Sequence, residues 1–599
     1  MLPSMIIVAI GLALFLYAGY RWALPKPLPG IPYNVEATKS LLGDAPALRR
    51  EVSKTGDLVA WFLKQNQKAG SPISQIFLQP LGGPYILVSD WRTARDVMLH
   101  RTREFDRSSL MYTYFEGLLG RQHFILKTGP EWKLHRRVVD DTMSPAFLNN
   151  MASHTIYARS LDWVELWNIK ARLAAGRPFK ASQDIHYAVL DTVLGFSFGS
   201  QFPRSATKPQ IERLARITPE TLGRLSTTQA IAESDTVIDF PEDPIDEGLK
   251  SMLELLETLE EVKTAPSVAL KWWFVKKTPA YRYRTQMKDE CIRTEIKKAV
   301  DARNRHGHDS IQADENPSWM RCAVAIIVDR EARNARREGR APDFFSTVVM
   351  EEIWGFLVAG TDTTSSVLAW SVKQLADHPK AQGRLRKALQ TTYAKAIAES
   401  RLPSVEEIIQ TPAPYLDATM EEILRCGGTI PIGDREAIVD TILLGHHIPK
   451  GTKVRFLHNG PGIRRPELEI NEKKYGNGLK DPNGMEKTIP GWDSEDVDLF
   501  RPERWLSGSK KSVSGEDDTE WADLAFDAQA GPSIPFGLGI RGCFGRRLAY
   551  MEFRILLTMV IWNFELLKCP EELSSYAGQL AFVHKPRNCF VRLRKVNYQ

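Results

Sequence analysis

Cysteine is scarce in this sequence of 599 residues, and the six that occur are scattered. There is no Cys-x-x-Cys pair and no Cys/His cluster at metal-ligand spacing, which excludes a zinc finger or zinc ribbon. About one cysteine per hundred residues is too few for a disulfide framework, so we expect a reducing compartment. Most of these cysteines are expected to be small buried hydrophobic residues.

Dense basic tracts, repeats and low-complexity blocks are also missing. The 79 Lys and Arg residues against 73 Asp and Glu residues give a formal net charge of only +6. No Lys/Arg run is interleaved with aromatic residues, so we expect no nucleic-acid partner. Mild basic charge is typical of proteins that meet a membrane surface or an acidic protein partner.

Charge is absent from residues 1–20, which form one largely apolar run. As a helix this run is long enough to cross about 30 Å of hydrocarbon. A cleaved signal peptide is the alternative, but it would need positive charge before the run, whereas Arg21 and Lys26 follow it. The pattern favours a single-pass anchor at 1–22 with the following chain in the cytosol. Residues 23–35 are rich in proline and are expected to form a stiff, extended strap.

The remaining chain, 36–599, is expected to be one large, mainly α domain with small β-sheets. Apolar periodicity predicts helices near 344–377, 414–426, 546–562, 90–100, 131–148 and 247–262. Strands are expected at 73–78, 85–88, 437–444 and 453–456. Two polar stretches, 303–318 and 459–491, are expected to be surface insertions of unassigned role.

The residues that indicate chemistry concentrate at 534–545, Ile-Pro-Phe-Gly-Leu-Gly-Ile-Arg-Gly-Cys-Phe-Gly. Gly539 and Gly545 permit tight turns that would expose backbone N–H groups to the Cys543 sulfur. The helix expected at 546–562 would begin beside that sulfur, where its dipole favours an anion. We therefore expect Cys543 to be a thiolate ligand of a metal.

The same stretch also fits the dinucleotide-binding pattern Gly537-x-Gly539-x-x-Gly542. That pattern must follow a buried strand and open a helix within a strand–helix–strand unit. Residues 527–535, with two prolines and a glycine, are not expected to form such a strand. A nicotinamide dehydrogenase is therefore a weak interpretation.

The pattern Phe536-x-x-Gly539-x-Arg541-x-Cys543-x-Gly545 resembles the haem-binding signature of the cytochrome P-450 family. The resemblance implies a mainly α fold that binds haem b, iron protoporphyrin IX. Cys543 would be the axial ligand of the iron. Arg541 would meet a haem propionate, and Phe536 would lie in the cofactor-binding loop.

A second motif lies in the predicted helix at 344–377, where Gly355–Ser366 ends in consecutive polar residues. Thr and Ser side chains can bond back to preceding carbonyls and bend a helix, and Ala359 with Gly360 would leave room for a small ligand. The segment resembles the family's oxygen-activation helix. On that resemblance Thr363 would hold water or dioxygen, and Asp362 would relay protons inward.

Three charged residues far apart in the sequence resemble a further family feature. Glu422 and Arg425 are three residues apart in the predicted helix at 414–426, and Arg504 lies in a Pro-Glu-Arg segment. The resemblance implies that they form a buried ionic triad, which would specify the fold more than stabilise it. Gly427-Gly428 departs from the family's apolar residue and proline.

The resemblance also assigns haem and substrate contacts. Trp132 and Arg136, together with Arg435, would meet the haem propionates. The substrate pocket would draw on residues spread over four segments: Met111, Phe115, Phe124, Val358, Ala359, Thr429, Ile430 and Pro431.

These features together predict a monooxygenase that hydroxylates, epoxidises or otherwise oxidises a largely apolar small molecule with O2. Electrons would come from NADPH through a separate cytochrome P-450 reductase, with cytochrome b5 as a further partner. Lys133, Arg137, Arg546 and Arg547 are the expected contacts for an acidic reductase. The alternatives are a haem-thiolate isomerase or dehydratase that uses no O2, and a non-catalytic haem-binding sensor.

The anchor, the insertions and the length resemble microsomal members from filamentous fungi that act in secondary metabolism, on terpenoids, polyketides or alkaloids. We therefore expect the chain in the endoplasmic reticulum membrane, in contact with lipid, with its catalytic domain in the cytosol.

Overall fold

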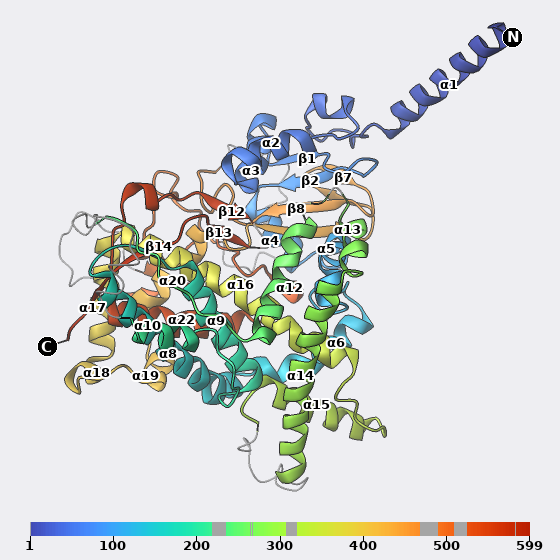
Figure 1. Ribbon diagram of the computed structural model, residues 1–599. Coiled ribbons are helices and arrows are strands. Elements are labelled where there is room, and N and C mark those ends of the chain that lie inside the picture. Colours follow the sequence, from blue (N-terminus) through green and yellow to red (C-terminus); the bar gives the residue numbers. More distant parts are fainter. Residues whose placement is uncertain are drawn as a thin grey trace. The chain divides into compact units, whose positions relative to one another are not determined.

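The computed structural model describes residues 2–217, 235–263, 265, 267–306, 320–467, 489–507, 524–580 and 583–598, without the side chains of residues 2–5 and 8 (Figure 1). The chain divides into two compact units, each assembled from three segments. Unit 1 comprises Met1–Ser108, Ile430–Leu499 and Gly531–Gly542. Unit 2 comprises Ser109–Thr429, Phe500–Ala530 and Cys543–Gln599. The interpretation of 36–599 as one catalytic domain stays a prediction.

Unit 1 is built around a mixed sheet with the strand order β1-β2-β8-β5-β3. Its strands are β1 Ile73–Ile76, β2 Tyr85–Val88, β8 Lys453–Leu457, β5 Ile432–Ala437 and β3 Phe105–Arg107, and β6 Thr441–Leu443 pairs with β7 His446–Ile448. Strand β2 runs parallel to β8, and the other neighbours are antiparallel. The apolar residues on one face of the sheet pack against Trp91, Ala94 and Val97 of α4 (Trp91–Leu99). Together these residues form the hydrophobic core of this unit.

The strand expected at 437–444 is wrong as a single element. Strand β5 ends at Ala437, and the chain then turns into the β6–β7 hairpin. Leu444 and Gly445 at the hairpin tip have positive φ angles of 48° and 76°, which an extended strand does not allow. The break within the predicted segment lies at 438–440, where the chain bends between β5 and β6.

The remaining helices of unit 1 precede the sheet: α1 Leu2–Ala23, α2 Ala45–Thr55 and α3 Leu58–Ala69. The proline strap includes a turn at 29–30, and the buried Gln75 side chain binds the backbone of Leu28 and Ile31, which ties the strap to β1. Among the described residues, no helix is long and apolar enough to cross a membrane. The segment expected to be an anchor, 1–22, is helical as α1, but its transmembrane character has no support.

Unit 2 is mainly helical. Its helices include α5 Ser109–Leu119, α6 Pro130–Val139, α8 Ser153–Ala174, α9 Ser182–Phe198, α10 Lys208–Ala215, α12 Glu247–Lys263, α13 Val268–Val275, α14 Pro279–His306, α15 Ala323–Arg337, α16 Thr347–Asp377, α17 Pro379–Thr392, α18 Ala394–Ala398, α19 Val405–Gln410, α20 Pro414–Gly427 and α22 Arg546–Asn563. Small sheets are formed by β4 Phe179–Lys180 with β14 Phe590–Lys595 and β11 Phe564–Leu567, by β9 Leu506–Ser507 with β10 Ala525–Phe526, and by β12 Gly578–Leu580 with β13 His584–Pro586.

The long helix α16 is the centre of this unit. Nearly all of its residues from Val349 to Ala376 are buried, because α9, α20 and α22 pack around it. The helices predicted at 344–377, 414–426, 546–562 and 247–262 are confirmed to within a few residues. The helix expected at 131–148 ends at Val139, where short helical turns take over.

Both predicted insertions fall partly outside the described residues. Of 303–318, the structure describes only the end of α14 up to His306. Of 459–491, residues 468–488 lie outside the described part.

Candidate functional site

Burial distinguishes Cys543 from the other cysteines. All six lie in the described part of the chain, and none forms a disulfide. Cys543 is exposed, whereas Cys322 is half-buried and the remaining four are buried. Burial raises the pKa of the Cys291, Cys322 and Cys569 thiols to about 11 and that of Cys589 to about 12, which keeps them neutral.

Cys543 lies just before the first turn of α22, whose N-terminal cap is Gly545. The predicted placement of a helix N-terminus next to this sulfur is therefore present, and the helix dipole favours a thiolate there. The dinucleotide-binding interpretation fails as expected: no strand precedes Gly537 in the described residues from 524 onward, other than the two-residue β10.

The loop before Cys543 depends on Gly539. Its φ angle is +68°, and a Cβ atom at this position would lie 2.2 Å from the Met98 carbonyl oxygen at the end of α4. Only glycine satisfies both conditions. Gly545 differs from the expectation: its φ of −80° is open to any residue.

Three arginines converge in unit 1: Arg435 and Arg541 are buried, and Arg107 is half-buried. Arg107 on β3 lies directly opposite Arg435 on β5, although like charges at such positions oppose pairing. Arg541 is also buried, and its carbonyl oxygen accepts a hydrogen bond of 3.4 Å from Arg107. Burial lowers the pKa of Arg107, and the charges of Arg541 and Arg435 lower it further, while Asp106 and Asp434 act against this. Three guanidinium groups near two carboxylates are typical of a site for an anion.

The remaining residue assigned to the cofactor in unit 1 is Phe536, which is half-buried in the same loop. Arg435 and Arg541 were predicted, whereas Arg107 was missed. An arginine in a three-residue strand gives no periodic signal, and only the strand register reveals that it meets Arg435.

In unit 2, Arg136 of the predicted pair on α6 contacts the residue that follows the cysteine. The Arg136 guanidinium lies 4.0 Å from the centre of the Phe544 ring and 5.8 Å from that of Trp132. Burial lowers the pKa of Arg136, although Asp140, with an oxygen 3.7 Å away, favours the charged form. A half-buried cation beside the cysteine loop is suited to an anionic ligand.

The oxygen-activation motif lies on an uninterrupted α16. The Thr363 hydroxyl donates a hydrogen bond of 2.7 Å to the Ala359 carbonyl, the local bond that its position suggested. Asp362 is half-buried, and one of its oxygens lies 3.7 Å from Nδ1 of His186 on α9. Burial lowers the pKa of His186, with Asp362 acting against this. His186 was missed, because a lone histidine in a helix carries no sequence signal.

Gly360 has a different role from the one expected. A Cβ atom at this position would lie 2.9 Å from a methyl group of Val193 on α9. Glycine is therefore required for the close packing of α9 on α16, rather than for ligand space. Ala359 is exposed, as a residue that faces a ligand space would be.

The structure brings together the three residues of the ionic triad. Glu422 and Arg425 on α20 are joined by hydrogen bonds of 2.7 and 2.8 Å, and Arg504 lies 3.1 Å from Glu422. The Arg501 backbone N–H and the Trp505 indole N–H also donate to Glu422. Burial would raise the pKa of Glu422, but Arg425 and Arg504 lower it to about 2. Removing one partner from such a buried group costs about 3–5 kcal/mol.

The departure at Gly427-Gly428 has a structural reason. Gly428 caps α20 with a left-handed φ of 53°, and its N–H donates to the Leu424 carbonyl. A left-handed cap of this kind favours glycine, which replaces the family's proline as the residue that stops the helix.

The predicted pocket residues are divided between the two units. Phe115 and Phe124 pack edge to face at 5.5 Å in unit 2, where Val358 is buried and Met111 and Thr429 are half-buried. Ile430 and Pro431 belong to unit 1.

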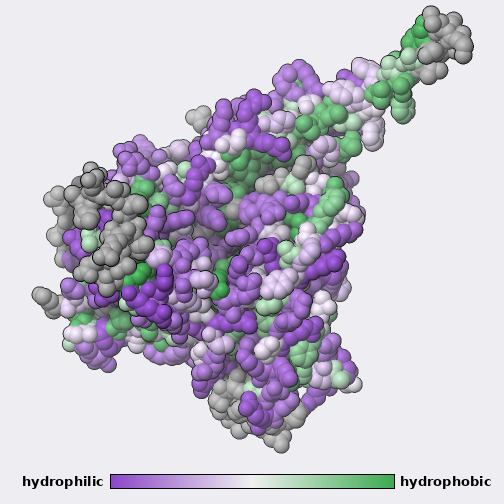
Figure 2. Space-filling model, viewed as in Figure 1, coloured by the Kyte–Doolittle hydropathy of each residue, from purple (hydrophilic) through white to green (hydrophobic). Residues whose placement is uncertain are grey.

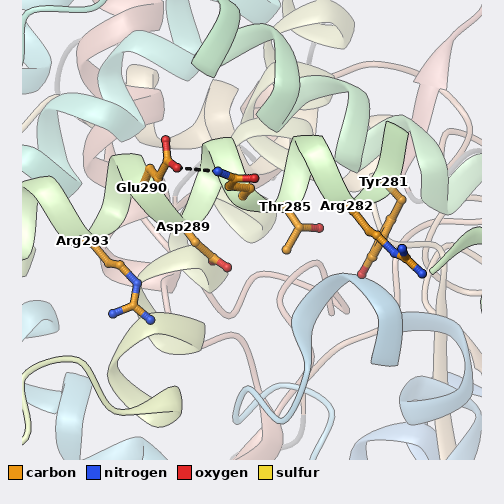
Figure 3. A pocket seen from close by; sticks show the side chains of 7 residues that line it. Tyr281, Arg282, Thr285, Asp289, Glu290 and Arg293 are labelled. Carbon is orange, nitrogen blue, oxygen red and sulfur yellow. Dashed lines mark hydrogen bonds between the residues drawn. The ribbon is translucent and has the colours of Figure 1, made fainter. Parts of the chain in front are cut away.

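A hollow of about 400 Å³ lies elsewhere, along α14 (Figure 3). Its side chains are polar and charged, and the Gln286 amide donates to Glu290 across one turn.

The family model for cytochrome P450 matches residues 41–461 and 495–592. Cytochrome P450 monooxygenase TRI13 of Fusarium sporotrichioides is 38% identical over 589 residues, which cover 98% of both chains. Cytochrome P450 monooxygenase xilC of Penicillium rubens is 35% identical over 97% of this chain and 94% of its own.

A third relative covers a part of the chain. The Hps1-dma1 cluster cytochrome P450 monooxygenase cyp3.1 of Dothistroma septosporum is 40% identical over 275 residues, which are 46% of this chain and 86% of that protein. The similarity to the first two relatives extends through both compact units.

Proposed function

The chain belongs to the cytochrome P450 family of haem-thiolate monooxygenases, and on this premise we propose that it oxidises a largely apolar small molecule with O2 and electrons from NADPH. The products would be hydroxylated, epoxidised or otherwise oxidised. We place the reaction in fungal secondary metabolism, on terpenoids, polyketides or alkaloids. The relatives' organisms and the gene cluster in one relative's name support this.

Family membership implies a haem iron cofactor, and the residues present fit it. The observation that carries the proposal is the exposed Cys543 at the start of α22, in a chain whose other thiols are at least partly covered. The cluster of Arg107, Arg435 and Arg541 carries positive charge that suits a propionate. In the proposal Cys543 would hold the iron, and Arg136 and Trp132 of the same unit would hold a carboxylate of the macrocycle. By the family resemblance, Arg435 and Arg541 of unit 1 would also meet propionates.

A bound haem would supply the activation of dioxygen. The chain's own contribution would be proton delivery from α16. The Thr363 oxygen can accept a hydrogen bond while its proton is held by Ala359, and Asp362 would carry protons to it. His186, held largely neutral by burial, would exchange protons with Asp362 from the α9 side.

The test is the reduced carbon monoxide spectrum of the full chain. The unaltered protein is expected to show the thiolate-type Soret band, and Cys543→Ala is expected to lose it. Cys569→Ala, which removes a buried thiol, is the matched control and should keep the band. A thiolate-type band in Cys543→Ala would overturn the proposal.

A second measurement separates the monooxygenase from an O2-independent isomerase or a haem sensor. With reductase present, substrate should drive NADPH consumption and product should carry an oxygen atom from O2. Turnover without NADPH and O2 would establish the isomerase, and absence of turnover would favour the sensor. Asp362 and Thr363, placed side by side on α16, support the monooxygenase.

The partners and location are also proposals. Lys133 and Arg137 on α6 and Arg546 and Arg547 on α22 are exposed, which supports docking of an acidic reductase or cytochrome b5. A reductase KM that rises with ionic strength is the expected result.

We propose residence at the cytosolic face of the endoplasmic reticulum membrane. Apolar side chains are exposed along α1 (Figure 2), among them Ile7, Phe15 and Trp22. In unit 2, Trp273 and Phe274 of α13 are exposed as well. Microsomal fractionation of the full chain and of a variant without residues 2–22 tests this location.

A further inference from the structure

A buried carboxylate, that of Glu352, lies on α16 before the oxygen-activation motif with Asp362 and Thr363. The Glu352 side chain has no solvent exposure. It contacts four donors: the His123 backbone N–H at 2.8 Å, His123 Nδ1 at 2.5 Å, His135 Nδ1 at 2.8 Å and the Gln122 amide at 3.0 Å. Burial would raise the pKa of Glu352, but the hydrogen bonds from both histidines lower it overall, so the group is an anion.

These contacts reach the cysteine loop by two routes. The His123 ring packs edge to face on the Phe544 ring, with centroids 5.2 Å apart. On α6, His135 is followed by Arg136, whose guanidinium lies 4.0 Å from the same Phe544 ring. Phe544 directly follows Cys543. The contacts that start at His123 and at His135 therefore both lead to the residue next to the cysteine.

The charges agree with this geometry. Burial lowers the pKa of Arg136, while the charges of Asp140, Glu352 and Cys543 favour its charged form. Arg136 belongs to the same unit as Glu352 and the thiol loop, and its guanidinium packs on the Phe544 ring of that loop. A carboxylate with several short hydrogen bonds fixes its partners more rigidly than neutral bonds would.

We infer that Glu352 is a positioning residue for the iron-binding loop: through His123 and His135 it fixes the ring and the guanidinium that contact Phe544. Glu352 touches no reacting atom in this arrangement, so its effect is on how firmly the Cys543 thiolate is held. The inference rests on the proposed function, in which Cys543 binds the haem iron.

The experiment replaces Glu352 by Gln, which keeps the shape and removes the charge. The matched control is Glu351→Gln, its neighbour on α16, which is half-buried and accepts a hydrogen bond from the Arg121 backbone N–H. In Glu352→Gln we expect equal haem content, but conversion of the reduced carbon monoxide complex from the thiolate-type band about tenfold faster, the effect of one lost charge-assisted hydrogen bond. The iron reduction potential should shift as well, while the control keeps both values.

A purely structural role would give a different result. Glu352→Gln would then lower the unfolding midpoint, while the potential and the band of the folded protein would stay unchanged, which would overturn the inference. A double-mutant cycle with Phe544→Leu tests the route. We expect the Glu352→Gln shift in potential to shrink severalfold in that background, and an equal shift in both backgrounds would contradict it.

Failure of the proposed function would be distinct. In that case the unaltered protein itself would lack the thiolate-type band, whereas failure of this inference leaves that band intact in both proteins.

Discussion

At the scale of single residues, three buried glutamates show how the surroundings set the charge of one side-chain type. Glu422 has arginine partners, and its pKa is about 2. Glu352 has histidine partners, and its pKa is also lowered. Glu552 on α22 is hydrogen-bonded by the hydroxyls of Thr192 and Thr364, and burial raises its pKa to about 7. Two of the three are therefore fixed anions, and the third titrates near neutral pH.

A single substitution at Asp362 tests the proposed proton relay. Asp362→Asn keeps the side-chain shape but would remove the proposed proton exchange with His186, so we expect turnover to fall by about 10²- to 10⁴-fold. NADPH should still be consumed, with a larger share of its electrons released as peroxide. Product formed per NADPH is the measurement, with the substrate-induced spectral shift as evidence of intact binding.

The control for Asp362→Asn is Asp377→Asn, at the far end of the same helix. An unchanged ratio of product to NADPH in Asp362→Asn would exclude the relay.

At the scale of elements, the fit of α16 against α9 depends on Gly360. The Cβ atom of an alanine would meet Val193 at 2.9 Å, so Gly360→Ala is expected to lose about 1–3 kcal/mol to overpacking, only partly offset by better helix propensity. Gly383→Ala on α17 is the matched control, because nothing lies within 4 Å of its Cβ position. That variant should gain about 0.5–1 kcal/mol.

Thermal unfolding midpoints of the two alanine variants check this. A Gly360→Ala protein as stable as Gly383→Ala would show that α9 and α16 separate without cost.

Elements were also where prediction from sequence worked best. Long apolar periods predicted α16, α20 and α22, because each buries a wide face. The 437–444 segment failed as a single strand because the chain bends at 438–440, between β5 and β6.

At the site, sequence motifs supplied the residues whose spacing is local, such as Arg541 and Cys543, and the ionic triad came from family resemblance. Arg107 and Glu352 were not predictable. Their roles come from partners that only the register of β3 or the packing of α6 on α16 brings close.

At the scale of the whole molecule, each compact unit contains its own buried titrating group. In unit 1, burial and the charge of Arg435 lower the pKa of His458 to about 4. The unfolded chain binds this proton below about pH 6.5 and the folded unit does not, so stability falls as pH drops from 6.5 to 4. In unit 2 the buried Glu552 has the opposite effect, because it lowers the free energy of unfolding as pH rises.

The Glu552 carboxyl keeps its proton to about pH 7 in the folded chain, whereas the unfolded chain releases it near the ordinary value of 4.5. Unfolding therefore releases a proton between these values, and the free energy of unfolding falls as pH rises through the window, by about 3 kcal/mol in total. Glu552→Gln should remove this loss. Its unfolding midpoint relative to the unaltered protein is expected to be higher at pH 8 than at pH 5.

The exposed Glu571→Gln serves as the comparison and should show no such difference. An equal effect of Glu552→Gln at both pH values would mean that the carboxyl is already ionised at pH 5 in the folded chain.

The full or partial burial of the cysteines other than Cys543 allows a chemical assay of the folded protein. A maleimide dye reacts with accessible thiolates, and four of the remaining cysteines combine burial or partial burial with a raised pKa. In a preparation of the folded chain, brief labelling should therefore mark Cys543 where no iron holds it. The dye-to-protein ratio would then report the fraction of molecules that had never acquired their prosthetic group.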